Sequence, residues 1–170
     1  MRSKTHSPLL SAYNYVLEDT PLGKLTLSFS PRGLAALTYP GEEAAVTPAS
    51  LAAATAAWVE LAKKELADYF RGIPTDFPST PLDLQGTPFQ VRVWQELKKI
   101  PYGTTISYKE LAARVGSPKA FRAAGQANAC NPIPIIIPCH RVIAADGSLG
   151  GYSSGLDRKR WLLRHEGVEI

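Results

Sequence analysis

Residues 131–142 read NPIPIIIPCHRV. The apolar run from Ile133 to Ile137 is short and bounded by prolines, and such a run predicts a buried strand. Directly after it, Cys139 stands next to His140. A thiol with an imidazole beside it is a candidate nucleophile with a base nearby. This stretch therefore predicts a chemical site at the end of a buried strand.

The neighbours of Cys139 favour a reactive thiol over a small core residue, which is the commoner role of a lone buried cysteine. Pro138 restricts the chain direction before it, and His140 and Arg141 are the kind of neighbours that lower the pKa of a thiol from about 8.5. Adjacent residues of an extended chain point to opposite sides. We therefore expect His140 to act on Cys139 through a bridging water or a bend.

The segment that follows supplies a candidate group to orient the imidazole. A helix is predicted over Asp157–His165, before the stop at Gly167. Glu166 follows it, and a carboxylate in this place could hold a base in position, although on the sequence alone a solvent-facing glutamate is the more frequent case. Asn131 is either a turn residue or a tie between the preceding helix and the Cys139 segment.

Three helices are predicted ahead of residue 131, over 88–100, 107–115 and 119–129. Thr87 has the side chain of an N-cap, and Pro88 suits the first helical position. Ser107 stands three residues before Glu110, which is the spacing of a capping box.

The second and third of these helices have the arrangement of a helix-turn-helix, with Gly116 in the turn. In that motif the second helix enters a DNA groove, although similar units are common as plain packing. Here the second helix is rich in alanine and glycine, which allows close approach to DNA without base readout. Lys119 and Arg122 lie three residues apart on one face of it.

The N-terminal half has the pattern of a small α/β unit. Tyr13–Glu18, Lys24–Ser30 and Leu34–Tyr39 are β-rich runs separated by turn sequences. Residues 41–47 suit a loop, and an alanine-rich helix is predicted from about Pro48 to Arg71. Prolines then mark residues 73–87 as an irregular linker. We therefore expect two domains, 1–85 and 86–170.

Charge is unevenly divided between these halves. The chain has 170 residues and a formal net charge of +4. Residues 1–85 carry 7 Lys or Arg and 9 Asp or Glu, whereas residues 86–170 carry 12 and 6. A basic half that also holds the Cys-His pair favours a polyanionic partner such as nucleic acid. The alternative is a solvated basic face with no partner.

Two cysteines are too few for a disulfide scaffold or a cysteine-based zinc site. A bridge between Cys130 and Cys139 is possible on paper, but an extended segment between them would strain it. No apolar run reaches the roughly 18 residues that span a bilayer. We expect a soluble, unexported protein in a reducing compartment, cytoplasmic or, in a eukaryote, nuclear.

The motif at residues 131–142 resembles the active-site signature of the O6-alkylguanine-DNA alkyltransferases, also called methylated-DNA–protein-cysteine methyltransferases. The resemblance continues through residues 150–153, 155–156 and 159–167, and includes 101–105 with Ser107 and Tyr108. It covers residues 86–167 strongly, whereas the N-terminal part is similar only in its order of strands and helix. Pro-Cys-His-Arg in this setting is a highly specific motif.

The resemblance implies a catalytic role for five residues. Cys139 would be the nucleophile and permanent alkyl acceptor, and His140 its base through a water, oriented by Glu166. Asn131 would be a hinge residue beside the site. Tyr108 would help rotate the target nucleotide and contact the guanine.

It also implies the residues that contact DNA and the base. Arg122 would fill the gap that a flipped base leaves, with Lys119, Ser107 and Tyr108 also on the DNA side. The guanine pocket would be lined by Pro134, Val142, Tyr152 and Ser153. No metal or other cofactor is implied.

The expected fold is α/β: a three-stranded antiparallel sheet with a helix, ribonuclease-H-like, and then a mostly helical domain with a winged-helix-like helix-turn-helix. The expected activity is single-turnover repair of O6-alkylguanine, and possibly O4-alkylthymine, in duplex DNA by a monomer. A non-catalytic lesion-binding relative is the alternative, but those proteins lack the acceptor cysteine. A cysteine hydrolase would need a distant histidine, and His6 and His165 lie in no catalytic context.

Overall fold

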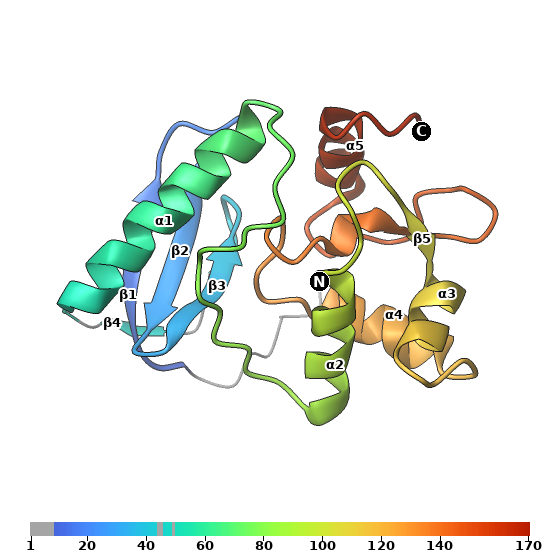
Figure 1. Ribbon diagram of the computed structural model, residues 1–170, viewed down its shortest axis with the longest axis horizontal. Coiled ribbons are helices and arrows are strands. Elements are labelled where there is room, and N and C mark those ends of the chain that lie inside the picture. The colour runs from blue at the N-terminus through green and yellow to red at the C-terminus, as the bar shows by residue number, and fades with distance from the viewer. Residues whose placement is uncertain (1–8, 44–45, 49) are drawn as a thin grey trace. The chain divides into compact units, whose positions relative to one another are not determined.

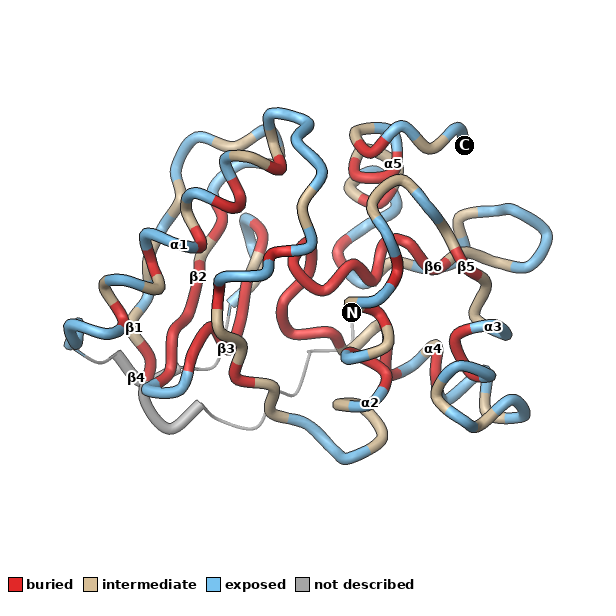
Figure 2. Tube along the Cα trace, viewed as in Figure 1, coloured by how far each residue is buried: buried red, intermediate tan, exposed pale blue. Residues whose placement is uncertain are grey.

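The computed structural model describes residues 9–43, 46–48 and 50–170, so His6 lies outside the described residues. Its contacts divide the chain into two compact units, Met1–Gln85 and Gly86–Ile170. Each unit contains buried apolar residues, and the buried positions are coloured red in Figure 2.

The first unit is a sheet covered by one helix (Figure 1). Strands β1 (Leu9–Leu17), β2 (Leu25–Ser30) and β3 (Gly33–Thr38) pair antiparallel, with Tyr13 opposite Phe29 and Leu27 opposite Leu37. This confirms the predicted three-stranded antiparallel sheet and the α/β class. A short strand β4 (Val46–Pro48) adds to the free edge of β1 in the parallel sense, where a loop was expected.

Helix α1 (Ala53–Phe70) buries a single stripe, formed by Thr55, Val59, Ala62, Glu65, Leu66 and Tyr69. Its start differs from the predicted one near Pro48, because Pro48 belongs to β4. The Glu65 carboxylate accepts bonds from the backbone N–H groups of Ser79 and Thr80 and from the Thr80 hydroxyl. The proline-rich linker is thus tied to α1.

The linker is also tied to the sheet. The Leu34 amide donates to the Pro81 carbonyl, and the Asp83 amide donates to the Leu34 carbonyl, each at 2.8 Å. Gly33 has φ +149°, and a Cβ on it would lie 2.6 Å from the Pro81 oxygen, so only glycine permits this approach.

Four helices dominate the second unit: α2 (Pro88–Leu97), α3 (Tyr108–Arg114), α4 (Phe121–Ala129) and α5 (Leu156–His165). Thr87 caps α2 in a reciprocal box with Gln90, and the Ser107 hydroxyl accepts from the Glu110 amide at the start of α3. Both caps were predicted. The Trp94 indole donates to the Ala127 carbonyl at 2.9 Å and thereby joins α2 to α4.

A two-stranded parallel pair connects these helices to the Cys139 segment. Strand β5 (Ile106–Ser107) precedes α3, and β6 (Val142–Ile143) follows the short helix η1 (Cys139–Arg141). Ile106 lies opposite Val142. The pair therefore fixes the position of η1 relative to the start of α3.

The predicted strand over Ile133–Ile137 is wrong. The segment is a buried turn in which the Ile137 amide donates to the Ile133 carbonyl at 2.9 Å and Ile135 has φ +73°. Prolines at 132, 134 and 138 have no N–H to donate to a sheet. The isoleucines are therefore buried by a compact turn instead of a strand.

Candidate active site

Asn131 holds the turn that leads to Cys139. Its side-chain N–H donates to the Ile137 carbonyl at 2.7 Å, and its carbonyl oxygen accepts from the Ile133 amide at 3.0 Å. The side chain is buried, and all residues of 131–142 are buried with it (Figure 2). Because both ends of one amide are bound to the turn, Asn131 fixes the approach to Cys139.

Cys139 borders a cavity of about 540 Å³. The walls are contributed by α3, by the pocket-facing side of α4 and by the loop before α5, and consist of Tyr108, Phe121, Arg122, Gly125, Asn128, Ala129, Gly151, Tyr152 and Ser153. Cys139 itself is only 5% exposed. The thiol-bearing residue thus lies at the buried end of the cavity. Cys130 and Cys139 are not joined by a disulfide.

His140 points away from bulk water into a fully buried ion cluster. Its Nε2 lies 2.7 Å from Glu166 Oε1. Arg141 donates to the same carboxylate from Nε at 2.8 Å and from one Nη at 3.0 Å. The Gly103 amide donates to it as well. Glu166 therefore accepts from three residues, and it is buried and does not face solvent, which was the alternative on sequence alone.

The surroundings of Glu166 determine the protonation state of His140. Burial alone would raise the pKa of Glu166, but hydrogen bonds from His140 and Arg141 and the nearby charge hold that pKa well below its usual range. Burial lowers the pKa of His140, although Glu166 opposes the shift. His140 is therefore neutral near pH 7, with its proton on Nε2 facing the carboxylate.

The other ring nitrogen of His140 is then an acceptor. Nδ1 is buried and makes no hydrogen bond to any described residue. A buried acceptor without a partner is unfavourable unless it serves a purpose. His140 thus combines an ionised carboxylate on one nitrogen with an available lone pair on the other, as a general base requires.

Lys159 on α5 lies beneath the loop at the cavity and is fully buried. Its ammonium donates to the Val142 carbonyl at 2.6 Å and to the Gly151 carbonyl at 3.1 Å. It also lies 5.8 Å from the centre of the Tyr108 ring. Burial lowers the pKa of Lys159 to about 8, and charge on Cys139 opposes this shift.

The buried charges near Cys139 do not cancel. Arg141 and Glu166 neutralise each other and His140 is uncharged, so Lys159 leaves one positive charge in the cluster. A nearby cation favours the thiolate form of cysteine. Arg141, in contrast, is occupied by Glu166 and the Ile100 carbonyl. Of the two, Lys159 is the cation available to Cys139.

Tyr108 is the first residue of α3 and lies between Lys159 and the cavity. Its hydroxyl donates to the Gly151 carbonyl at 3.2 Å. Burial raises the pKa of Tyr108, and charge on Cys139 raises it further. Tyr108 therefore keeps its proton and can act as a hydrogen-bond donor at the cavity wall.

The structure brings together some of the predicted site residues at the cavity and places others behind it. Cys139, Tyr108, Arg122, Tyr152 and Ser153 line it. His140, Glu166 and Asn131 form the buried layer that supports Cys139. Pro134 and Val142 are buried and are not among the lining residues, and Val142 contributes its carbonyl to Lys159. Ser107 caps α3, and Lys119 is exposed just before α4.

Lys159 and Asn128 were missed from the sequence. Asn128 is buried on α4, and its side-chain N–H lies 3.4 Å from the Cys139 carbonyl that it faces. Its carbonyl oxygen makes no hydrogen bond to any described residue. Neither residue carries a local signal, since a lysine in a basic helix suggests solvent and an asparagine near a helix end suggests a cap.

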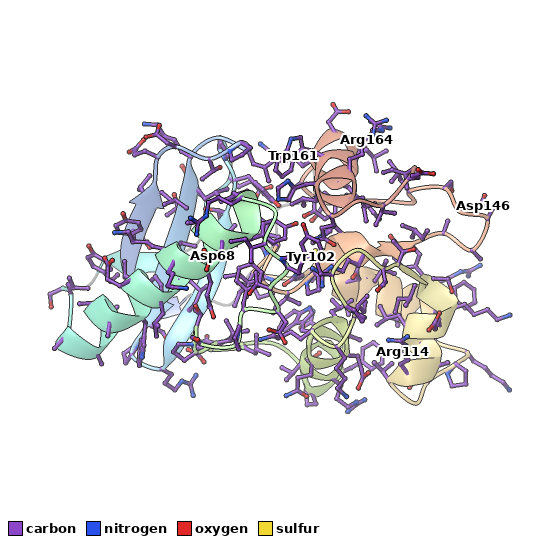
Figure 3. The ribbon with its side chains drawn as sticks, turned by 45° about the horizontal axis from the view of Figure 1, so that its top comes forward. Asp68, Tyr102, Arg114, Asp146, Trp161 and Arg164 are labelled. Atoms are coloured by element: carbon purple, nitrogen blue, oxygen red, sulfur yellow. The ribbon has the colours of Figure 1, made fainter. Side chains whose placement is uncertain are left out.

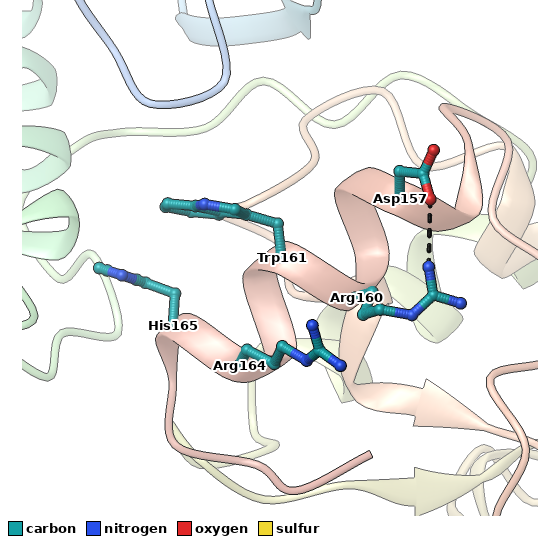
Figure 4. Close-up of a pocket in the computed structure, with 5 residues that line it drawn as sticks. All are labelled: Asp157, Arg160, Trp161, Arg164 and His165. Atoms are coloured by element: carbon teal, nitrogen blue, oxygen red, sulfur yellow. Dashed lines mark hydrogen bonds and ion pairs between the residues drawn. The ribbon is translucent and has the colours of Figure 1, made fainter.

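A second hollow, of about 520 Å³, runs along α5 away from these residues (Figure 4). Asp157, Arg160, Trp161, Arg164 and His165 line it, on one face of the helix. The Trp161 and His165 rings stack with centroids 4.7 Å apart, and Arg160 pairs with Asp157 at 3.1 Å. Figure 3 shows Trp161 and Arg164 projecting from the same helix. None of the predicted site residues borders this hollow.

The described part of the chain contains no group of three or more His, Cys, Asp or Glu that could hold a metal ion. None of its helices is long and apolar enough to cross a membrane.

Comparison with known proteins gives consistent matches. Residues 88–168 match the family model of the 6-O-methylguanine DNA methyltransferase DNA-binding domain. A methylated-DNA–protein-cysteine methyltransferase of Methanosarcina acetivorans is 44% identical over 90% of this chain and 97% of its own length.

Solved structures of methyltransferases are similar to this chain as well. Mycobacterium tuberculosis OGT in complex with DNA has a TM-score of 0.79 at 44% identity, covering 91% of this chain and 92% of that one. The O6-methylguanine-DNA methyltransferase of Pyrococcus kodakaraensis has a TM-score of 0.60 at 25% identity, covering 92% and 99%. With a relative this similar over nearly its whole length, the chain belongs to the methylated-DNA–protein-cysteine methyltransferases.

Proposed function

We propose that this protein repairs O6-alkylguanine in duplex DNA by moving the alkyl group irreversibly to Cys139, once per molecule. The observation that carries the proposal is the cavity that Cys139 shares with Tyr108 and Arg122. A volume of about 540 Å³ suits one ligand of nucleobase size, since such sites measure roughly 300–1,000 Å³.

The first step is activation of the thiol. The proton of Cys139 passes through a bridging water to Nδ1 of His140, and the imidazolium that forms is stabilised by Glu166 at 2.7 Å. Lys159 stabilises the thiolate electrostatically. Asn131 keeps the turn before Cys139 rigid, which maintains the position of the sulfur.

The second step is an in-line displacement at the alkyl carbon. A sulfur–carbon bond forms as the carbon–oxygen bond breaks, and the electron pair of the latter stays on O6 of the guanine. The restored guanine takes up one proton at N1, which balances the proton lost by the thiol. The thioether has no easy route to hydrolysis, so each protein molecule reacts once.

The target base must leave the helix to reach Cys139, because its alkyl group is not accessible inside a duplex. Helix α4 begins without a side-chain cap, so its first N–H groups can face a phosphate, with Lys119 and Arg122 beside them. We assign to Arg122 the space that the extruded base vacates. Ser107 and Tyr108 lie at the start of the neighbouring helix, where Tyr108 contacts the guanine.

Tyr152 and Ser153 form the wall of the guanine pocket, and Pro134 and Val142 support it from behind. Acceptance of O4-alkylthymine, a monomeric state and a cytoplasmic location belong to the same proposal. The first two rest on the family resemblance, whereas the location rests on the sequence pattern alone.

Mass spectrometry of the intact protein tests the proposal. After mixing with duplex DNA that contains O6-methylguanine, we expect one added methyl group per chain, located on Cys139 by peptide mapping. The two cysteines supply the matched pair of variants. Cys139→Ser should take up no methyl group, whereas Cys130→Ser should react like the parent chain.

Repeated turnover, or methylation elsewhere, would contradict the assignment of Cys139. Tight binding to the damaged duplex with no adduct would favour the non-catalytic lesion-binding alternative.

A further inference from the structure

Phe121 is a large aromatic side chain that the structure leaves in solvent at the edge of the cavity. It is 46% exposed, and it lines the cavity together with Arg122. Because so much of the ring is in water, core packing does not explain it. Its position beside the reactive cysteine suggests a ligand that covers it.

The ring occupies the outer end of a continuous face of α4. Phe121, Gly125, Asn128 and Ala129 are spaced four, seven and eight residues from the first, so they share one side of the helix and all four line the cavity. Asn128, at the inner end, faces the Cys139 carbonyl. The Phe121 ring therefore lies on the same helix face that reaches Cys139 at its inner end.

Arg122 is the neighbour of Phe121 in space as well as in sequence. Its guanidinium carbon lies 5.8 Å from the centre of the Phe121 ring. An exposed pair of this kind contributes little to stability by itself. The contact does place the planar guanidinium of Arg122 beside the planar ring of Phe121. In the proposed function, Arg122 fills the space that the extruded base leaves in the duplex.

We propose that Phe121 is an apolar wedge that stacks on the base pair beside the extruded nucleotide, while Arg122 occupies the vacated position. This inference rests on the proposed function. Apolar side chains that enter a base step unstack and kink the duplex. Stacking of a base on an aromatic ring is tolerant of sequence, which suits a protein that must act on damage in any context.

The substitution Phe121→Ala distinguishes an effect on opening the duplex from an effect on alkyl transfer to Cys139. We expect methyl transfer from duplex DNA, measured at limiting DNA in a single turnover, to slow by roughly tenfold to a hundredfold, the range that loss of one base stack gives. Reaction with the free base O6-benzylguanine should slow much less than reaction with the duplex, since no base pair has to be opened.

Leu156→Ala is the matched control. Leu156 is also the first residue of its helix and is 43% exposed, but it does not line the cavity. It should change neither rate. Phe121→Trp should retain fast repair of the duplex, and Phe121→Leu should fall between the parent and the alanine variant, because leucine keeps bulk but cannot stack.

The coupling with Arg122 gives an independent readout. Arg122→Ala should slow duplex repair far more than the free-base reaction. If the two side chains act as one wedge, the double variant should be only slightly slower than Arg122→Ala alone.

Three results would overturn the inference. An unchanged duplex rate in Phe121→Ala shows that the ring does not contact DNA during repair. Equal losses of rate with duplex DNA and with the free base show that Phe121 has a structural role instead. Full additivity with Arg122→Ala shows two independent contacts. In all three cases methylation of Cys139 in the parent chain would still support the proposed function, whereas a parent chain that takes no methyl group from DNA removes both.

Discussion

Glu166 is the buried carboxylate near Cys139, and its role follows from the hydrogen bonds that it accepts. It accepts hydrogen bonds from His140, Arg141 and Gly103, and it is buried. Removing one partner of a buried pair leaves an uncompensated charge, here the guanidinium of Arg141. The same residue therefore supports both the stability of the second unit and the orientation of the base.

Glu166→Gln should lower the free energy of unfolding at pH 7 by about 3 kcal/mol, the cost of breaking a buried ion pair. The pKa of Glu166 is held below its ordinary 4.5, so the unfolded state binds the proton first as pH falls. The stability that the ionised Glu166 carboxylate contributes is fully present above about pH 4.5 and is lost as the pH falls below that value. The difference between parent and variant should therefore shrink in acid, as measured by urea unfolding across pH.

Glu169→Gln is the control, because Glu169 is exposed near the same end of the chain. It should leave the unfolding free energy within about 0.5 kcal/mol of the parent. A difference between Glu166→Gln and the parent that stays constant down to pH 3 would contradict the ion-pair account.

The sequence nominates residues that carry a motif and misses those that act through burial. Cys139 and His140 were nominated from their own pattern, with Glu166 as a candidate orienter, and the structure brings His140 and Glu166 into contact. Lys159 was missed because its burial depends on where α5 packs. Arg141 was expected to act on the thiol, but its bidentate pairing with Glu166 depends on two segments 25 residues apart.

At the scale of elements, local signals predicted the starts of α2 and α3, whereas the start of α1, which has no side-chain cap, was predicted too early. The caps at Thr87 and Ser107 are made by side chains that bond within their own first turn, so sequence alone suffices. The buried turn at 133–137 could not be predicted, because its isoleucines are apolar in any fold and two of its backbone groups bond to the Asn131 side chain. Proline spacing was the available signal against a strand.

The loop before α5 approaches the start of α3 closely at Gly150. Gly150 has φ +67°, and a Cβ on it would lie 2.9 Å from the Tyr108 ring. Gly150→Ala should therefore displace Tyr108 and slow even the reaction with free O6-benzylguanine by about tenfold, in line with the cost of small misplacements in active sites. Stopped-flow measurement of the two rates checks this.

Gly147→Ala is the matched control for backbone strain. Gly147 has φ +84° in the same loop, but nothing lies within 4 Å of its added Cβ. Both variants should lose about 1 kcal/mol of stability from the left-handed conformation. Only Gly150→Ala should react more slowly with O6-benzylguanine. Equal rates for the Gly150→Ala and Gly147→Ala variants would exclude a role for the contact between Gly150 and the Tyr108 ring.

At the scale of the whole molecule, the two units differ in charge. The first carries a formal net charge of −2 and the second +6, from the counts of 7 against 9 and 12 against 6 charged residues. Two of the positive charges of the second unit, Arg141 and Lys159, are buried. The remaining basic residues are the ones that can attract the phosphates of DNA.

The salt dependence of DNA binding tests whether affinity depends on the position of a basic residue or only on the net charge of the chain. Each phosphate contact contributes a slope of about −0.9 to the plot of log affinity against log salt concentration. Lys119→Ala should make that slope shallower by about one unit on undamaged duplex, because Lys119 is exposed just before α4. Fluorescence anisotropy between about 50 and 200 mM salt measures it.

Lys64→Ala removes the same formal charge from the acidic unit, where Lys64 pairs with Asp68 on α1. If DNA binds at α4, this variant should keep the parent slope, since the net charge of the chain changes equally in both variants. Equal changes in slope would mean that net charge alone governs binding. That outcome would leave the placement of DNA on α4 without support, whereas a change confined to Lys119→Ala localises a phosphate within reach of the helix that also carries Arg122.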